Sequence, residues 1–82
     1  MKKYILFEHY KTAKQINRFM EKEVRLTLCM PTLSLDMDDG LVRNVYEYSA
    51  ISTHFEGMHN YITIVDTKQG TPIKAECYVE KW

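Results

Sequence analysis

The spacing of apolar residues predicts a strand and then an amphipathic helix at the start of the chain. In Lys3–Tyr10, apolar residues fall on both faces of an extended segment, a pattern typical of a central strand. Thr12 and Gln15 then form a capping-box pattern, in which the threonine hydroxyl accepts a hydrogen bond from the backbone N–H three residues later. The helix that begins there carries one apolar stripe, which we expect to pack on a sheet: Ala13, Ile16, Phe19, Met20 and Val24.

After the helix the apolar pattern changes to a period of two, which predicts strands. Apolar residues occupy even positions from Val24 to Met30 and odd positions from Leu33 to Met37. Pro31 lies between the two phases, and because proline has no N–H we expect an edge or a bulge there.

The segment SLDMDDGLVRNVYE, residues 34–47, predicts a β-hairpin. With Asp39 and Gly40 as a two-residue type I′ turn, Asp36 faces Arg43 and forms a cross-strand ion pair. The competing interpretation is a calcium loop, which would start at Asp36 and end at a glutamate. That loop requires glycine at its sixth position, where this chain has Leu41, so the hairpin is preferred.

The second half of the chain predicts further strands. In residues 41–60 an apolar stripe also fits a helix over Arg43–Phe55, but the β-branched and aromatic content favours a strand that ends in a turn at Glu56–Met58. Residues 61–65 are rich in β-formers, residues 67–70 are typical of a loop, and the alternation at residues 73–79 predicts a last strand with one polar face.

These elements predict one α+β domain over residues 1–82. Its N-terminal amphipathic helix packs on one face of a mostly antiparallel sheet in the order β-α-β-β-β-β; the alternative is a β-α-β-α-β-β two-layer sandwich. The hydrophobic content of 45% is that of a folded domain, and no apolar run is long enough to span a membrane, so we expect a cytoplasmic protein. Cys29 and Cys77 lie in strand-like contexts and are expected to be buried thiols.

The side chains that carry chemistry are scattered. No nucleophile stands beside a base, and the three glycines form no phosphate-binding loop, so no enzymatic activity and no cofactor is predicted. His9, His54 and His59 lack the spacing of zinc ligands, and a metal site built from them with Glu56 is not favoured.

The net charge of zero hides an uneven distribution of charge. Residues 1–25 hold seven Lys or Arg and three acids, whereas residues 26–66 hold one Arg and six acids. Along the predicted helix, basic residues recur on the face opposite the apolar stripe, where like charges at i and i+4 repel one another. The alternative function is therefore nucleic-acid binding, through Lys14, Arg18, Lys22 and Arg25.

The aromatic load favours a protein-binding surface. Six Tyr, three Phe and one Trp exceed what so small a core hides, and tyrosine is enriched at interfaces. The predicted contact residues lie on strands and in the acidic hairpin: Tyr46, Tyr48, Tyr78, Trp82, Asp36, Asp38 and Asp39. We expect a non-catalytic inhibitor or adaptor of a larger protein, with a homodimer formed by pairing of the last strand as a further expectation. The Lys-, Ile- and Tyr-rich composition is similar to that of small phage or bacterial accessory proteins.

Overall fold

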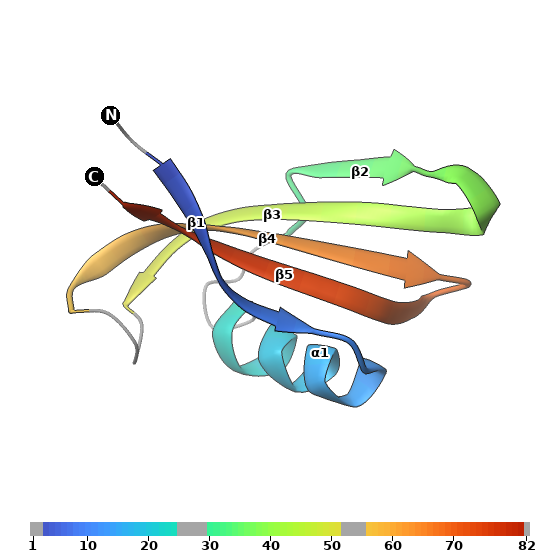
Figure 1. Ribbon diagram of the computed structural model, residues 1–82, viewed down its shortest axis with the longest axis horizontal. Helices are drawn as coiled ribbons and strands as arrows, with labels where there is room; N and C mark the ends of the chain where they lie inside the picture. Colours follow the sequence, from blue (N-terminus) through green and yellow to red (C-terminus); the bar gives the residue numbers. More distant parts are fainter. Residues whose placement is uncertain (1–2, 25–29, 52–55, 82) are drawn as a thin grey trace.

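The computed structural model describes residues 3–24, 30–51 and 56–81 and shows an α+β fold, which confirms the predicted class. A short helix lies beside a five-stranded antiparallel sheet (Figure 1). The elements in chain order are β1 (Lys3–Tyr10), α1 (Ala13–Phe19), β2 (Leu33–Asp36), β3 (Leu41–Ile51), β4 (Met58–Lys68) and β5 (Thr71–Lys81). None of the helices in this part of the chain has the length and apolar composition needed to cross a membrane.

The strands lie side by side in the order β1-β5-β4-β3-β2, which corrects two expectations. β1 is an edge strand although both its faces are apolar, because only β5 pairs with it. β5 is an interior strand with β1 on one side and β4 on the other. Its backbone donors and acceptors are therefore used within the chain, and the last strand cannot pair with a second copy as predicted.

The start of α1 follows the sequence prediction. The Thr12 hydroxyl accepts a hydrogen bond from the Gln15 backbone N–H at 3.3 Å, so Thr12 is the N-cap. Ile16 and Phe19 of the apolar stripe are buried. A π-helical turn, Met20–Val24, follows α1, and most of the strand predicted for residues 24–30 lies outside the described residues.

The core lies between α1 and the interior strands β4 and β5. Buried and less buried residues alternate along β4 and β5, as expected for strands with one face against a helix. The buried residues form two adjoining clusters, one of Phe19, Tyr61, Cys77 and Val79 and one of Ile16, Val65 and Ala75. Partly buried aromatic rings close the rim: Phe7 lies 5.9 Å and Tyr48 5.4 Å from Tyr61, and Tyr10 lies 5.3 Å from Phe19, between ring centroids.

The hairpin at residues 34–47 is confirmed, but its predicted register is wrong. The turn has three residues, Asp38–Gly40, and is closed by the Met37 N–H, which donates to the Leu41 carbonyl at 2.7 Å. This extra residue shifts the pairing by one, so Asp36 faces Val42 rather than Arg43. Because side chains alternate between faces, the shift moves Asp36 and Arg43 to opposite sides of the sheet.

The two-residue turn occurs instead between β4 and β5. Gln69 and Gly70 both have positive φ, at 52° and 81°, as a type I′ turn requires, and Lys68 faces Thr71 across it. The helical alternative for residues 43–55 is wrong over residues 43–51, because Leu41–Ile51 is a strand that pairs with β4 along its whole length. Residues 52–55 of that alternative lie outside the described residues.

Candidate protein-binding face

The helix covers only one side of the sheet. Alternation and strand register place a second set of side chains on the opposite side, which we call the open face. None of the described helices or turns packs over it. Its central residues are Leu6 of β1, Tyr78 of β5, Ile62 and Ile64 of β4, Val45 and Glu47 of β3, and Leu33 and Leu35 of β2.

An apolar band runs diagonally across the open face from β1 to β2. Leu6 faces Tyr78, which faces Ile62 on the next strand. One step along, Ile64 faces Val45, which faces Leu33 on the edge strand. Leu6 and Leu33 remain 43% and 50% exposed. The residues between them are half-buried, and an apolar surface that is open to solvent makes this face a candidate interaction site.

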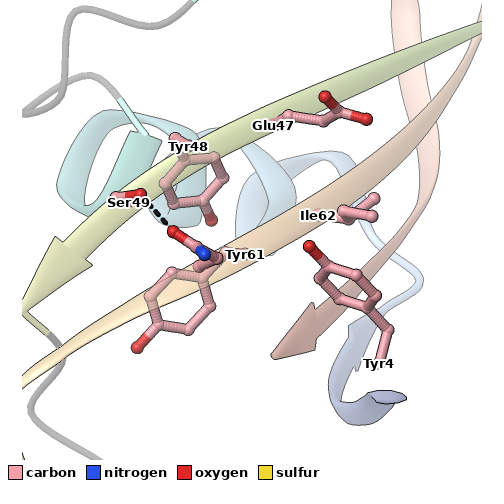
Figure 2. A pocket seen from close by; sticks show the side chains of 7 residues that line it. Tyr4, Glu47, Tyr48, Ser49, Tyr61 and Ile62 are labelled. Carbon is pink, nitrogen blue, oxygen red and sulfur yellow. Dashed lines mark hydrogen bonds between the residues drawn. The ribbon is translucent and has the colours of Figure 1, made fainter. Parts of the chain in front are cut away.

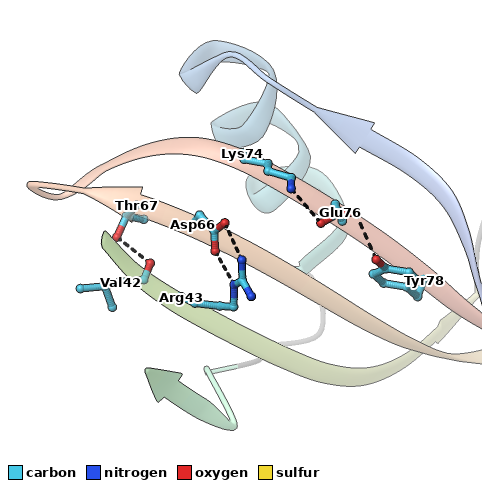
Figure 3. Close-up of polar contacts among 7 residues, drawn as sticks. All are labelled: Val42, Arg43, Asp66, Thr67, Lys74, Glu76 and Tyr78. Carbon is cyan, nitrogen blue, oxygen red and sulfur yellow. Dashed lines mark hydrogen bonds and ion pairs between the residues drawn. The ribbon is translucent and has the colours of Figure 1, made fainter. Parts of the chain in front are cut away.

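A row of charged side chains borders one side of the band (Figure 3). The Arg43 guanidinium donates two hydrogen bonds to the Asp66 carboxylate, at 2.8 and 3.1 Å, in a bidentate ion pair between β3 and β4. The hydrogen bond to Asp66, followed by the negative charge of that carboxylate, raises the pKa of Arg43. Lys74 lies 3.4 Å from Glu76 on β5, which completes the row.

A hollow of about 400 Å³ borders the other side of the band. In Figure 2, Ile62 lies between Glu47 of β3 and Tyr4 of β1. Ser49 and Asn60 also line the hollow, and Ser49 donates a hydrogen bond to Asn60. The Tyr4 hydroxyl donates to the Glu80 carboxylate at 2.8 Å. That hydrogen bond raises the pKa of the Tyr4 phenol, and burial and the negative charges of Glu80 and Glu47 raise it further.

Of the predicted contact residues on strands, the open face contains Tyr78 alone among those described. Its hydroxyl donates to the Glu76 carboxylate at 3.1 Å, and burial, followed by this bond, raises its pKa. Tyr46 and Tyr48 lie on the helix side instead, where both pack against the core. Trp82 lies outside the described residues.

The acidic part of the predicted site is separate from the tyrosines. Asp36 ends the edge strand β2 and points to the helix side, and Asp38 and Asp39 lie in the turn that follows. All three are exposed. The acidic turn is thus a second surface at one end of the β2–β3 hairpin.

The basic residues of the alternative function lie along α1 and the π-helical turn. Lys14, Arg18 and Lys22 are all exposed, whereas Ile16 and Phe19 on the opposite side of the helix are buried. Arg25, the fourth predicted residue, lies outside the described residues. Three cations therefore form a strip on the layer farthest from the open face.

The described residues present no assembled catalytic or metal centre. Within residues 3–24, 30–51 and 56–81, no three His, Cys, Asp or Glu side chains are grouped so that they could hold a metal ion. His54 and Cys29 lie outside these ranges. Cys77 is buried, and its sulfur accepts a hydrogen bond from the Thr63 hydroxyl at 3.3 Å, which itself lies 2.8 Å from the Tyr48 hydroxyl. This thiol belongs to a packed polar network in the core.

Sequence reasoning missed most of the open face. β-Formers identify Ile62 and Ile64 only as part of a strand and do not say which face they occupy. Apolar residues at both 61 and 62 and at both 64 and 65 do indicate a strand with two apolar faces. The pairing of Arg43 with Asp66 has no sequence signal, because 23 residues separate them.

No protein-family model, curated protein sequence or solved structure matches this chain. The assignment of function therefore depends on the geometry of the chain itself.

Proposed function

We propose that this domain is a non-catalytic protein-binding module, an inhibitor or adaptor whose contact surface is the open face of the sheet. The observation that supports the proposal is the apolar band at the centre of that face. Each 100 Å² of apolar surface removed from water stabilises a complex by about 2.5 kcal/mol before the costs of association. The charged row and the polar hollow supply a rim, the usual anatomy of a protein interface.

The remaining surfaces fit the same role. The acidic turn with Asp38 and Asp39 lies at the end of the β2–β3 hairpin, where it can contact a basic surface of a larger protein. Charged residues at an interface rim mainly set orientation and association rate, and the apolar band supplies affinity.

The test compares two variants of the whole chain in affinity capture from cell extract, with nuclease treatment of a parallel sample. Leu6→Ser/Leu33→Ser alters two exposed band residues on different edge strands, and Lys14→Glu/Arg18→Glu alters the opposite layer. We expect a captured protein that survives nuclease, binds wild type and the helix variant, and is lost from the band variant. Equal capture by the band variant would contradict the proposal, provided that circular dichroism shows it folded.

A second candidate function, nucleic-acid binding, is favoured by the exposed cations of α1. Lys14, Arg18 and Lys22 recur at intervals of four residues, and their mutual repulsion of a few tenths of a kcal/mol per pair does not help the helix. Fluorescence anisotropy with labelled single-stranded and duplex DNA tests it. Binding through these cations should weaken steeply with salt, and Arg18→Glu/Lys22→Glu should abolish it. Unchanged binding in that variant excludes this use of the helix.

A further inference from the structure

We propose that the partner of the open face is a second copy of this chain, so that two sheets pack face to face across a two-fold axis. This inference rests on the proposed use of the open face for protein binding, and it makes a second copy, rather than a larger protein, the occupant of that face. The product is a sandwich of two sheets about 10 Å apart, with the helix of each copy on the outside.

The size of the open face suits a stable dimer. Three of the strands have 11 residues, which gives each a length of about 36 Å. Strands stand about 4.8 Å apart, so the five strands offer an area comparable with the roughly 800 Å² per partner of a standard protein interface. The apolar band crosses the centre of this area beside Glu47 and Glu76. The other charged groups lie toward the two ends of the face, where an interface has its polar rim.

The order of charges along β5 makes the open face complementary to itself. Lys74 lies at one end of the face and Glu80 at the other, with Tyr78 and Glu76 between them. A two-fold axis in the interface plane and across the strands exchanges these ends. It therefore places Lys74 of each copy over Glu80 of the other, so that both ends form ion pairs of opposite charge.

The same axis matches the neighbouring strands. On β4 it places Ile62 over Ile64 of the second copy, so the two apolar bands cross at these isoleucines, and on β5 it places the Tyr78 ring over Glu76. On β3 it places Val45 over Glu47 of the second copy. On β3 it places Arg43 of one copy over Ser49 of the other, within reach of Glu47. The Arg43–Asp66 ion pair of each copy then stands over the hollow of about 400 Å³ beside Ile62. A polar ridge thus meets a polar hollow at both ends of the interface.

Other arrangements of two copies fit less well. With the axis parallel to the strands, Lys74 would lie over Arg43 and Asp66 over its own counterpart, which places like charges together. Pairing of two β1 edges meets the irregularity between Leu6 and Glu8, a type of feature that blunts edge strands. The other edge strand, β2, has only four residues.

The experiment is sedimentation equilibrium of the purified full chain, with two charge reversals that are tested separately and mixed. Wild type should sediment with the mass of two chains. Lys74→Glu sets a carboxylate against Glu80 at both ends of its dimer, and Glu80→Lys sets an ammonium group against Lys74 at both ends. Because each variant brings like charges together twice, each should raise the dimer Kd at least about tenfold. An equimolar mixture of the two variants restores both ion pairs and should re-form dimers.

The mixture separates interface charge from misfolding, because two misfolded variants would not recover by mixing. Lys14→Glu, on the outer face of α1, is the matched control and should leave the Kd unchanged. A wild-type protein that stays monomeric up to millimolar concentration overturns the inference, and so does a dimer that both reversals leave intact or a mixture that does not recover. A monomeric wild type contradicts the dimer but not the proposed function. The proposed function is tested separately by the capture experiment with the Leu6→Ser/Leu33→Ser variant.

Discussion

The β4–β5 hairpin and the β2–β3 hairpin belong to one sheet but differ in burial. In β4 and β5 every second residue along the centre is buried, whereas all four residues of β2 are exposed and none of the described side chains of β3 is buried. The helix explains the difference. α1 has seven residues and packs on β5, and a helix about 10 Å across covers about two strands spaced 4.8 Å apart.

This comparison shows that one hairpin of the sheet mainly stabilises the fold, whereas the other mainly offers surface for contacts. The hairpin under the helix holds the core. From the β2–β3 hairpin, Tyr46 and Tyr48 pack against that core, and the side chains on its open face have no described element above them. Figure 1 shows β2 and β3 extending past the end of α1. We therefore expect substitutions in β4 and β5 to lower the stability of the fold, and substitutions in β2 and β3 to change mainly the contacts that the domain makes.

The largest effect on stability is expected from shortening a side chain that is buried under the helix. Ile16 is completely buried between α1 and the sheet, so Ile16→Ala should lower the free energy of unfolding by about 2–5 kcal/mol. Leu33→Ala on the edge strand is the matched variant. Leu33 is half exposed, and its truncation should cost at most about 1 kcal/mol. Urea unfolding measures both, and equal losses would remove the distinction between the hairpins.

The next effect concerns the ion pair that joins the two hairpins. Asp66→Asn removes the charge that Arg43 binds and should cost about 1–2 kcal/mol. The Arg43 side chain is 36% exposed, so solvent screening keeps the value at the low end. A double-mutant cycle with Arg43→Met should give a coupling near 1 kcal/mol, and the more exposed Lys74–Glu76 pair should give under about 0.5 kcal/mol. A coupling of zero for Arg43–Asp66 would mean that this ion pair does not help to join the two hairpins.

A smaller effect is expected from the hydroxyl that links β3 to the core. Tyr48→Phe removes the contact with the Thr63 hydroxyl at 2.8 Å and should cost about 1 kcal/mol. The control, Ser49→Ala, removes a hydrogen bond on the exposed side of the same strand and should change stability by less than about 0.5 kcal/mol. Thermal unfolding followed by circular dichroism distinguishes them, and the reverse order would contradict the placement of Tyr48 on the helix side.

The smallest effect is a dependence on alkaline pH. The pKa values of Tyr4 and Tyr78 are raised above the usual 10.0, so the folded state favours the neutral phenols. Their contribution to stability is complete below pH 10 and is lost as the pH rises through the folded-state pKa values. Unfolding free energies measured in steps above pH 10 should therefore decline.

The pKa values of the two tyrosines are raised by different causes, and titrations followed by phenolate absorbance can test this difference. The largest cause at Tyr4, on the edge strand, is the hydrogen bond to Glu80, so Glu80→Ala should return its pKa most of the way to 10. The largest cause at Tyr78, on an interior strand, is burial, so Glu76→Ala should lower its pKa only in part and leave it above 10. A full return of Tyr78 would contradict burial as the main cause.

Local chemistry made part of this fold predictable. The Thr12 cap, the burial of Ile16 and Phe19, and the alternation that ends in β5 depend on neighbouring residues, and all three appear as expected. The turn at Asp39 and Gly40 was placed correctly but with two residues rather than three. Turn length depends on backbone angles that several residue types satisfy. With the turn one residue too short, the prediction puts Arg43 on the same face as Asp36, whereas in the structure the two residues lie on opposite faces.

The sequence by itself determined the helix start, the strand content and the α+β class, because capping and periodicity act over a few residues. Only the tertiary structure decided which strands are neighbours, that Arg43 meets Asp66, and that Leu6, Ile62, Ile64 and Leu33 share one uncovered face. These features join residues that are far apart in the chain, and they depend on the pairing of whole strands and on the short reach of one helix. Neither the pairing of whole strands nor the reach of the helix leaves a local pattern in the order of residues.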